Sequence, residues 1–258
     1  MSPAVRVRVP ATSANLGPGF DALGLALGLH DEVTASVGPE PGLQVVVTGE
    51  GAADVPRDER HLVVRAFRAA EQRWGAVGGG GLRLDCVNRI PHARGLGSSA
   101  AAIVAGVLAA RALAGATVPV DEVLRLATEI EGHPDNVAAC LFGGVTVAWT
   151  ESTGARAARV EPSPDLDPVV LIPATTASTQ AVRRLLPGTV PHADAAANAG
   201  RAALLVHALA TDPSLLLPAT EDRLHQPYRA PAMPDSADLV ARLRAGGTAA
   251  VVSGAGPT

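Results

Sequence analysis

Apolar and polar positions alternate in several short stretches in the first half of the chain, a pattern typical of strands with one buried face. Val5, Val7 and Val9 alternate with arginines, and residues 82–87 read Leu-Arg-Leu-Asp-Cys-Val. Two further runs, 33–37 and 43–48, are bounded by prolines and glycines that favour turns. These stretches predict four strands of a sheet.

Longer segments predict helices, at 58–74, 98–114, 193–209 and 235–245. Another helix is expected from about 119 to 132, because two acidic residues stand in its first turn, where they complement the helix dipole. Strands and helices thus share the chain, and the pattern alone predicts a mixed α+β fold.

The pattern changes near residue 150. Residues 143–149 predict a turn followed by a strand, whereas 151–168 have the proline, serine and aspartate content of a connection. Beyond it we expect a buried strand, a short capped helix and a last strand, at 169–174, 178–187 and 248–252. Two domains are therefore predicted, 1–155 and 165–258.

The composition excludes several classes of function. A hydrophobic content of 47% over 258 residues supports packed cores, whereas 2% aromatic residues provide no stacking platform for single-stranded nucleic acid. The net charge of −4 also argues against a nucleic-acid partner. The longest apolar run, 100–110, is too short to span a bilayer, and the N-terminal pattern is that of a strand and not of a signal peptide. We expect no membrane partner and a cytoplasmic location, with Cys86 and Cys140 as buried thiols.

Residues 91–100 join a predicted strand to an alanine-rich helix through glycine and serine. Gly95 and Gly97 lack Cβ atoms, so their backbone can approach a ligand closely. Ser98 and Ser99 can cap the helix, whose free amides and partial positive charge favour a phosphate group. The segment therefore predicts an anion-binding loop next to which the serine hydroxyls could reach Mg²⁺.

Three other kinds of loop share features with this segment. An ordinary glycine-rich turn with a serine N-cap is one alternative. A Walker A loop is excluded because it needs lysine, and the chain contains none. The dinucleotide fingerprint is matched by the spacing of Gly95, Gly97 and Ala100, but the preceding strand ends well before the first glycine.

The sequence Pro-x-x-x-Gly-Leu-Gly-Ser-Ser-Ala resembles the ATP-binding motif of the GHMP small-molecule kinases. The resemblance implies that ATP is bound by a continuous run of residues: Pro91, His92, Ala93, Arg94, Gly95, Leu96, Gly97, Ser98, Ser99, Ala100 and Ala101.

Other segments resemble the homoserine kinases within that family. They are Thr-Ser-Ala-Asn-Leu-Gly-x-Gly-Phe-Asp at 12–21, Glu-Gly-His-Pro-Asp-Asn-Val-Ala at 131–138, and the segments at 178–187 and 221–229. The resemblance implies that L-homoserine is bound by Asn15, Asp21, His133, Asn136, Thr179, Arg183 and Arg229. From type alone, a capping, turn or surface role is the alternative for each. Arginine can bind a carboxylate through two parallel hydrogen bonds, which suits an amino-acid substrate.

Asp21, Asn136 and Arg183 are the expected catalytic residues. Some members of the superfamily have an aspartate as catalytic base where Asn136 aligns, so the resemblance implies no dedicated base there. Ser98 and one carboxylate are expected to hold Mg²⁺. Glu129 and Glu131 lie two residues apart on a helix and cannot share one face, so only one of them is expected to point inward. Alignment with the family pattern favours Glu129.

The resemblance implies the GHMP kinase fold, with a nucleotide domain like domain 2 of ribosomal protein S5 and a second, ferredoxin-like α+β domain. Residues 253–258 resemble the start of the family's third motif, so the second domain is expected to lack its C-terminal end. The implied activity is ATP-dependent phosphorylation of L-homoserine in threonine biosynthesis, with a possible homodimer. A mevalonate or sugar kinase of the same family and a nucleotide-binding protein without catalysis are the alternatives.

Overall fold

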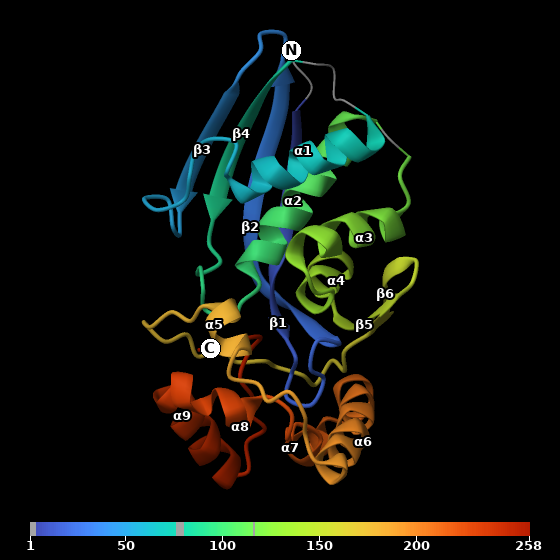
Figure 1. The fold of residues 1–258 in the computed structure, drawn as a ribbon, viewed down its shortest axis with the longest axis vertical. Coiled ribbons are helices and arrows are strands. Elements are labelled where there is room, and N and C mark those ends of the chain that lie inside the picture. The colour runs from blue at the N-terminus through green and yellow to red at the C-terminus, as the bar shows by residue number, and fades with distance from the viewer. Residues whose placement is uncertain (1–3, 76–79, 116) are drawn as a thin grey trace.

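The structure is a computed structural model that describes residues 4–75, 80–115 and 117–258. Figure 1 shows a sheet in the upper part of the molecule, helices across one of its faces, and a second group of helices below it. The chain leaves the sheet after its last strand, β6 (Gly154–Val160), and enters the lower part.

The sheet has six strands in the order β3-β4-β2-β5-β6, with β1 paired to β2. The other strands are β1 (Ala4–Ala14), β2 (Leu23–Gly38), β3 (Leu43–Gly49), β4 (Gly81–Asn88) and β5 (Val145–Glu151). β3 and β4 run parallel, whereas the other described pairs are antiparallel. β2 organises the sheet, because β1 and two other strands, β4 and β5, pair along its length.

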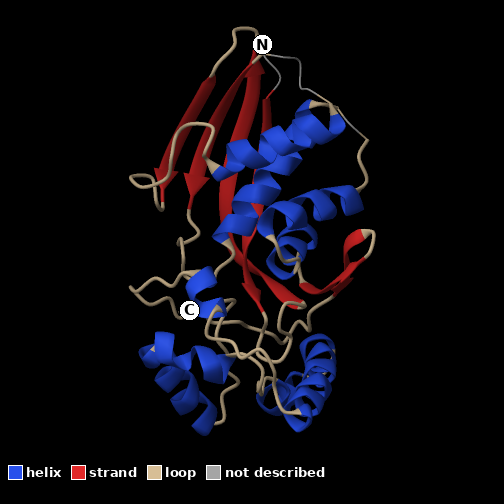
Figure 2. Ribbon diagram, viewed as in Figure 1, coloured by secondary structure: helices blue, strands red, loops and turns tan. Residues whose placement is uncertain are grey.

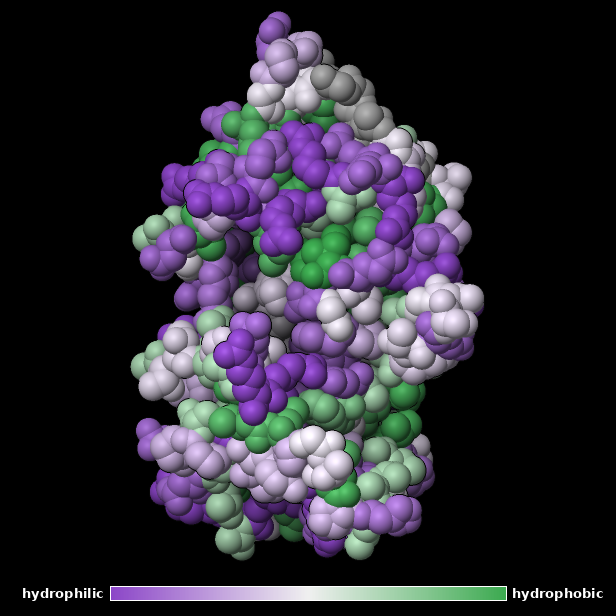
Figure 3. Space-filling view, in the orientation of Figure 1, coloured by the Kyte–Doolittle hydropathy of each residue, from purple (hydrophilic) through white to green (hydrophobic). Residues whose placement is uncertain are grey.

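Four helices pack on the sheet: α1 (Leu62–Trp74), α2 (Ser98–Leu113), α3 (Val120–Glu131) and α4 (Asp135–Phe142). α2 is apolar on nearly every side and is buried along most of its length, as expected for a helix at the centre of a core. α1 is amphipathic, and Figure 3 shows mainly hydrophilic residues over its outer surface. The predicted strands and helices of the first half are therefore confirmed, but β2 is much longer than the predicted run 33–37 and begins at Leu23, and β1 continues to Ala14.

One strand was not predicted. Residues 154–160 were expected in a connection, but they form β6, which pairs along its whole length with β5. Its small and polar residues lack the apolar alternation of a strand, and the neighbouring strand supplies the partners for its backbone groups. The sheet therefore extends to Val160, past the predicted limit of the first domain at residue 155.

The lower part consists of helices and loops (Figure 2). It contains α5 (Thr179–Arg183), α6 (His192–Ala210), α7 (Leu216–Ala219), α8 (Gln226–Arg229) and α9 (Pro234–Ala245), with short 3₁₀ turns at Pro213–Leu215 and Ala230–Ala232. The helices expected at 178–187, 193–209 and 235–245 are confirmed, and Ser178 caps α5 as predicted.

The two strands expected in this part are not formed. Residues 169–174 and 248–252 have no strand assignment, and no residue described after Val160 lies in a strand. Val169 is 78% exposed, so the first segment is not buried as predicted. An apolar run predicts burial, but a strand also needs a neighbour for its backbone hydrogen bonds, and neither segment pairs with one here. The sheet of the expected ferredoxin-like domain is thus not seen in the described residues.

Candidate active site

The glycine-rich loop lies between β4 and α2. Gly95 and Gly97 have φ angles of 73° and 68°, in the left-handed region that favours glycine. A Cβ atom at Gly97 would lie 2.0 Å from Oγ1 of Thr12, and one at Gly95 would lie 2.2 Å from the carbonyl oxygen of Ser253. Both glycines are therefore required by backbone conformation and by close packing.

The expected capping of α2 by Ser98 or Ser99 is wrong. Gly97 occupies the N-cap position, and no side chain accepts a hydrogen bond from the first turn. Ser98 and Ser99 are instead the first two residues of the helix. The amides at its start are thus left without a capping side chain, which suits the binding of an anion.

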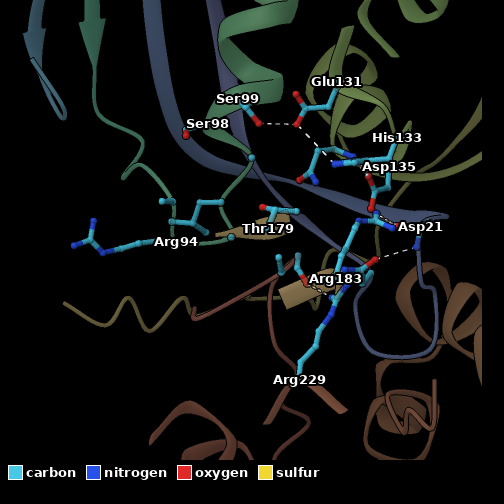
Figure 4. A pocket seen from close by; sticks show the side chains of 18 residues that line it. Asp21, Arg94, Ser98, Ser99, Glu131, His133, Asp135, Thr179, Arg183 and Arg229 are labelled. Carbon is cyan, nitrogen blue, oxygen red and sulfur yellow. Dashed lines mark hydrogen bonds and ion pairs between the residues drawn. The ribbon is translucent and has the colours of Figure 1, made fainter. Parts of the chain in front are cut away.

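A pocket opens in front of this helix start, and Figure 4 shows the side chains that line it. Residues from both parts of the molecule contribute. They are Asn15, Asp21, Ala93, Arg94, Gly95, Leu96, Gly97, Ser98, Ser99, Glu131, His133, Asp135, Asn136, Thr179, Arg183, Arg229, Gly254 and Ala255.

All seven residues expected to bind the substrate line this pocket, together with residues 93–99 of the loop. The other four residues of the loop that were expected to bind ATP lie elsewhere: Pro91 and Ala100 are not among the lining residues of the described cavities, whereas His92 and Ala101 line a neighbouring cavity. The side chain of Arg94 points away from the other labelled side chains in Figure 4 and donates to the carbonyl oxygens of Pro173 and Ala174.

Of the two glutamates considered as the Mg²⁺ ligand, the favoured Glu129 does not line the pocket. The carboxylate of Glu129 forms an exposed ion pair with Arg73 of α1, at 2.6 Å. Glu131 lines the pocket instead, and its carboxylate accepts a hydrogen bond of 2.6 Å from the hydroxyl of Ser99. Glu131 is the last residue of α3, and this position brings it to the start of α2. Alignment with a pattern did not resolve this two-residue choice, which depends on how α3 packs.

The side chains of Asp21 and Arg183 meet in the pocket (Figure 4). The two side chains form a bidentate ion pair, with Nη1 of Arg183 at 2.9 Å from Oδ2 of Asp21 and Nη2 bonded to Oδ1. The Asp21 carboxylate raises the pKa of Arg183 further. The fork of Arg183 that was expected to bind the substrate carboxylate is therefore occupied by a residue of the protein.

Asn15 holds the loop that carries Asp21. Its amide nitrogen donates to the carbonyl oxygen of Gly254 at 2.7 Å, and its Oδ1 accepts from the backbone N–H of Asp21 at 2.9 Å. Asn15 and Asp21 have positive φ angles of 67° and 54°, as does Ala93 of the glycine-rich loop, at 54°. Such conformations cost about 1–3 kcal/mol each and concentrate at functional sites.

Arg229 is the most deeply buried cation of the pocket, with 2% of its surface exposed. Its Nη1 donates to the carbonyl oxygen of Gly254 at 3.1 Å, whereas Nε is buried without a partner. Burial, followed by the charge of Arg183, lowers the pKa of its guanidinium group. A buried cation with an unpaired donor is costly, and an anion bound beside it would remove that cost.

His133 and Asp135 form a hydrogen-bonded pair, and both residues line the pocket. Nδ1 of His133 lies 2.7 Å from Oδ1 of Asp135, which is 2% exposed, and Nε2 lies 3.9 Å from the carboxylate of Glu131. The hydrogen bond to Asp135 raises the pKa of His133 despite partial burial. Asp135 also accepts from the backbone N–H of Asn136 at 2.8 Å, so one carboxylate orients two residues of the pocket.

A second cavity lies on the other side of Ser98 and Ser99 and has a volume of about 290 Å³. Its walls are mostly apolar, with Val55, Val63 and Ala105 among them. His61 is a polar member of this lining, 5% exposed, and its Nδ1 is buried without a partner. Sequence analysis missed this cavity, because no motif spans the helices and loops that form it.

Asp135, Gly254 and Ala255 also line the first pocket without having been predicted. Asp135 lies inside a segment that resembles the homoserine kinases, and Gly254 and Ala255 lie in the segment that resembles the third motif of the family, so the motifs contained the signal, but not the role of these residues. In the described ranges of the chain, no group of three or more His, Cys, Asp or Glu side chains is arranged to hold a metal ion by itself. No helix in those ranges is long and apolar enough to cross a membrane.

Comparison with known proteins gives concordant results. The model of the GHMP kinases N terminal domain matches residues 61–144. The chain is 63% identical to a homoserine kinase of Streptomyces coelicolor over 260 residues, covering 99% of this chain and 83% of that protein.

Solved structures are similar as well. A crystal structure of homoserine kinase from Cytophaga hutchinsonii matches with a TM-score of 0.86 and 28% identity, covering all of this chain and 84% of that one. L. major mevalonate kinase, solved with R-mevalonate, matches with a TM-score of 0.65 at 16% identity, covering 100% of this chain and 87% of that one, and this likeness concerns the fold alone.

Proposed function

Because this chain belongs to the homoserine kinases of the GHMP kinase family, we propose that its pocket transfers the γ-phosphoryl group of ATP to the side-chain hydroxyl of L-homoserine. The products are O-phospho-L-homoserine and ADP, and the reaction serves threonine biosynthesis. The observation that carries this proposal is the buried Arg229, whose Nε has no partner, in the same pocket as the uncapped start of α2.

The phosphate chain of ATP binds at the start of α2. The backbone of Gly95 and Gly97, the first amides of the helix and the hydroxyl of Ser98 supply donors for its oxygens. The nucleoside then enters the cavity of about 290 Å³ on the other side of Ser98 and Ser99. This arrangement leaves the γ-phosphate at the mouth of the first pocket.

Mg²⁺ would be held by Ser98 and Glu131, together with phosphate oxygens and water. A hydroxyl and one carboxylate are the donors that Mg²⁺ takes from proteins when a nucleotide supplies the remaining ligands. The carboxylate of Glu131 lies next to Ser99 at the helix start, so the donor set fits the ion. When bound, the ion neutralises charge that develops on the phosphate oxygens.

The carboxylate of homoserine binds to Arg229. Nη1 of this guanidinium is held by the carbonyl oxygen of Gly254, whereas its Nε has no hydrogen-bond partner. Arg183 and Thr179 border the same space from α5. Arg183 holds Asp21 and adds positive charge, and Asn15 fixes the loop between β1 and β2 that presents Asp21.

Asp21 accepts a hydrogen bond from the reacting hydroxyl and orients it toward the γ-phosphate. Asn136 donates its amide N–H groups into the pocket, and as an amide it takes up no proton. His133 is oriented by Asp135 and borders the same space. Catalysis in this proposal rests on alignment and electrostatic stabilisation, which are sufficient for a loose phosphoryl-transfer transition state.

The experiment that tests the function is coupled ADP release with MgATP and L-homoserine, run beside L-serine, L-threonine and mevalonate. Mass spectrometry of the product identifies phosphohomoserine. We expect ADP release with homoserine well above that with the other three. Stabilisation by ATP in thermal unfolding without turnover of any acceptor would instead favour a nucleotide-binding protein, and turnover of mevalonate would favour another kinase of the family.

We also propose a cytoplasmic enzyme, in keeping with the two free and buried cysteines, Cys86 and Cys140. A homodimer is proposed on the family resemblance, and sedimentation velocity of the purified protein tests it.

A further inference from the structure

His225 lies directly behind Arg229 and is 0% exposed. It belongs to the segment before α8, one turn before the arginine, and it does not line the pocket. Its ring stacks on Phe20, with centroids 5.1 Å apart and an angle of 27° between the planes. The guanidinium carbon of Arg229 also lies 5.1 Å from the centre of the Phe20 ring. One aromatic ring thus contacts both side chains.

The hydrogen bonds of His225 define its tautomer. Nε2 lies 2.7 Å from the carbonyl oxygen of Gly17, which only accepts, so Nε2 carries the proton and donates. Nδ1 lies 3.3 Å from Nη1 of Arg229, which only donates. Nδ1 must therefore carry a lone pair, and His225 is neutral when both contacts are made. Burial lowers the pKa of His225, which agrees with this neutral form.

Several charged groups lie near the contact between His225 and Arg229. Asp222 is 0% exposed; its carboxylate accepts from the backbone N–H groups of His225 and Gln226 and lies 3.5 Å from Nε2 of His225. Arg229 approaches from α8, while Arg183 from α5 lies over the Phe20 ring and is paired with Asp21. Asp222 thereby fixes the turn that carries the histidine.

We propose that His225 is a positioning residue that sets the orientation of Arg229 for binding the substrate carboxylate. Nδ1 and the carbonyl oxygen of Gly254 together hold Nη1, so the guanidinium is fixed in one orientation at the wall of the pocket. The bond to Gly17 ties this arrangement to the loop that carries Asp21. The inference rests on the proposed function, in which Arg229 binds the carboxylate of homoserine.

Two substitutions separate the roles of the two ring nitrogens. In His225→Asn, Oδ1 takes the place of Nδ1 and can still accept from Arg229, whereas the bond to Gly17 is lost. In His225→Gln, the side-chain amide reaches the position of Nε2 and can still donate to Gly17, whereas the acceptor for Arg229 is lost. Both variants remove the ring that stacks on Phe20, so each is a control for the other.

The measurement is the KM for L-homoserine and for ATP, with kcat, in both variants. We expect His225→Gln to raise the homoserine KM by about tenfold, since it removes a hydrogen bond to a charged group, and to leave the ATP KM within about twofold of wild type. His225→Asn is expected to keep a homoserine KM several-fold closer to wild type. Equal homoserine KM values in the two variants would overturn the inference.

Arg229→Gln distinguishes this inference from the function on which it rests. If Arg229→Gln raises the homoserine KM and the two His225 variants are equal, the carboxylate assignment stands and the positioning role fails. If Arg229→Gln leaves the homoserine KM unchanged, the carboxylate assignment itself fails. In the Arg229→Gln background, the change of His225 to Gln is expected to cause no further rise, because the group it positions is absent.

Discussion

The hydroxyl of Thr12 donates a hydrogen bond of 2.7 Å to Oδ1 of Asn136, and both side chains are buried. Thr12 lies in β1 and Asn136 in the first turn of α4, so the bond joins residues that are 124 positions apart. It occupies the acceptor of the amide and leaves the N–H groups for the pocket. We therefore expect Asn136 to act toward the reactants as a donor.

Thr12→Val tests this orientation, because valine keeps the shape of threonine and removes the hydroxyl. We expect kcat to fall by about tenfold, which corresponds to the loss of one buried hydrogen bond, with a smaller change in the homoserine KM. Thr146→Val is the matched control, since Thr146 is also 0% exposed but makes only a 3.5 Å contact to Gly24 away from the pocket. Equal kcat values in the two variants would show that the Thr12 bond does not orient Asn136.

Gly97→Ala tests the close packing of the phosphate loop. The added Cβ would lie 2.0 Å from the Thr12 hydroxyl at a φ angle of 68°, so the loop must move. We expect the KM for ATP to rise by at least about tenfold and the protein to be destabilised by about 1–3 kcal/mol. Gly188→Ala provides the control, because a Cβ there meets no atom within 4 Å. An unchanged ATP KM in Gly97→Ala would contradict the proposed location of the phosphates.

Glu131→Gln and Glu129→Gln separate the two candidate metal ligands. Glu131 lies at the helix start beside Ser99, whereas Glu129 is paired with Arg73 on the surface. We expect Glu131→Gln to raise the Mg²⁺ concentration needed for half-maximal turnover by about tenfold or more. Glu129→Gln loses only an exposed ion pair, which contributes about 0–1 kcal/mol to stability, and should leave the Mg²⁺ requirement unchanged. The opposite result would restore Glu129 as the ligand.

The pH dependence of stability tests the pair of His133 and Asp135. The pKa of His133 is raised above its ordinary value of 6.5, chiefly by the hydrogen bond to Asp135. The folded protein thus binds this proton more tightly than the unfolded chain does. The stabilisation is fully present below about pH 6.5 and is lost as the pH rises through the pKa of the folded state.

Denaturant unfolding of wild type and His133→Gln across pH 5–9 measures this effect. We expect the difference in free energy of unfolding between the two proteins to shrink as the pH rises above about 6.5. Comparing variants removes the opposite contributions of His61 and His225, whose pKa values are lowered by burial. A difference that is constant with pH would contradict the pairing.

Local pattern was sufficient for most of the first half of the fold. The alternation in β1 and β4 indicates burial of one face, and the alanine-rich run of α2 indicates burial on all sides. Burial is the property that such patterns predict. Pairing is a different property. Residues 169–174 are apolar but have no neighbouring strand, whereas β6 is small and polar but pairs with β5. Neither outcome is encoded in the segment itself.

In the site too, local sequence predicted which residues take part but not which contacts they make. Motifs identified the residues that converge on the pocket, because each motif residue was matched one by one to a family pattern. Contacts between distant residues were not foreseen: Asp21 already occupies the fork of Arg183, and Thr12 holds Asn136. The unpaired Nε of Arg229 depends on burial, which no motif states.

The central claim is that the pocket recognises the carboxylate of an amino acid beside bound ATP. The most direct test compares kcat/KM for L-homoserine with that for 3-aminopropan-1-ol, which has the same hydroxyl and amine but no carboxylate. We expect kcat/KM to be lower for the amino alcohol by about 100-fold or more, because the buried Arg229 would be left unpaired. Equal kcat/KM values for the two acceptors would contradict the claim.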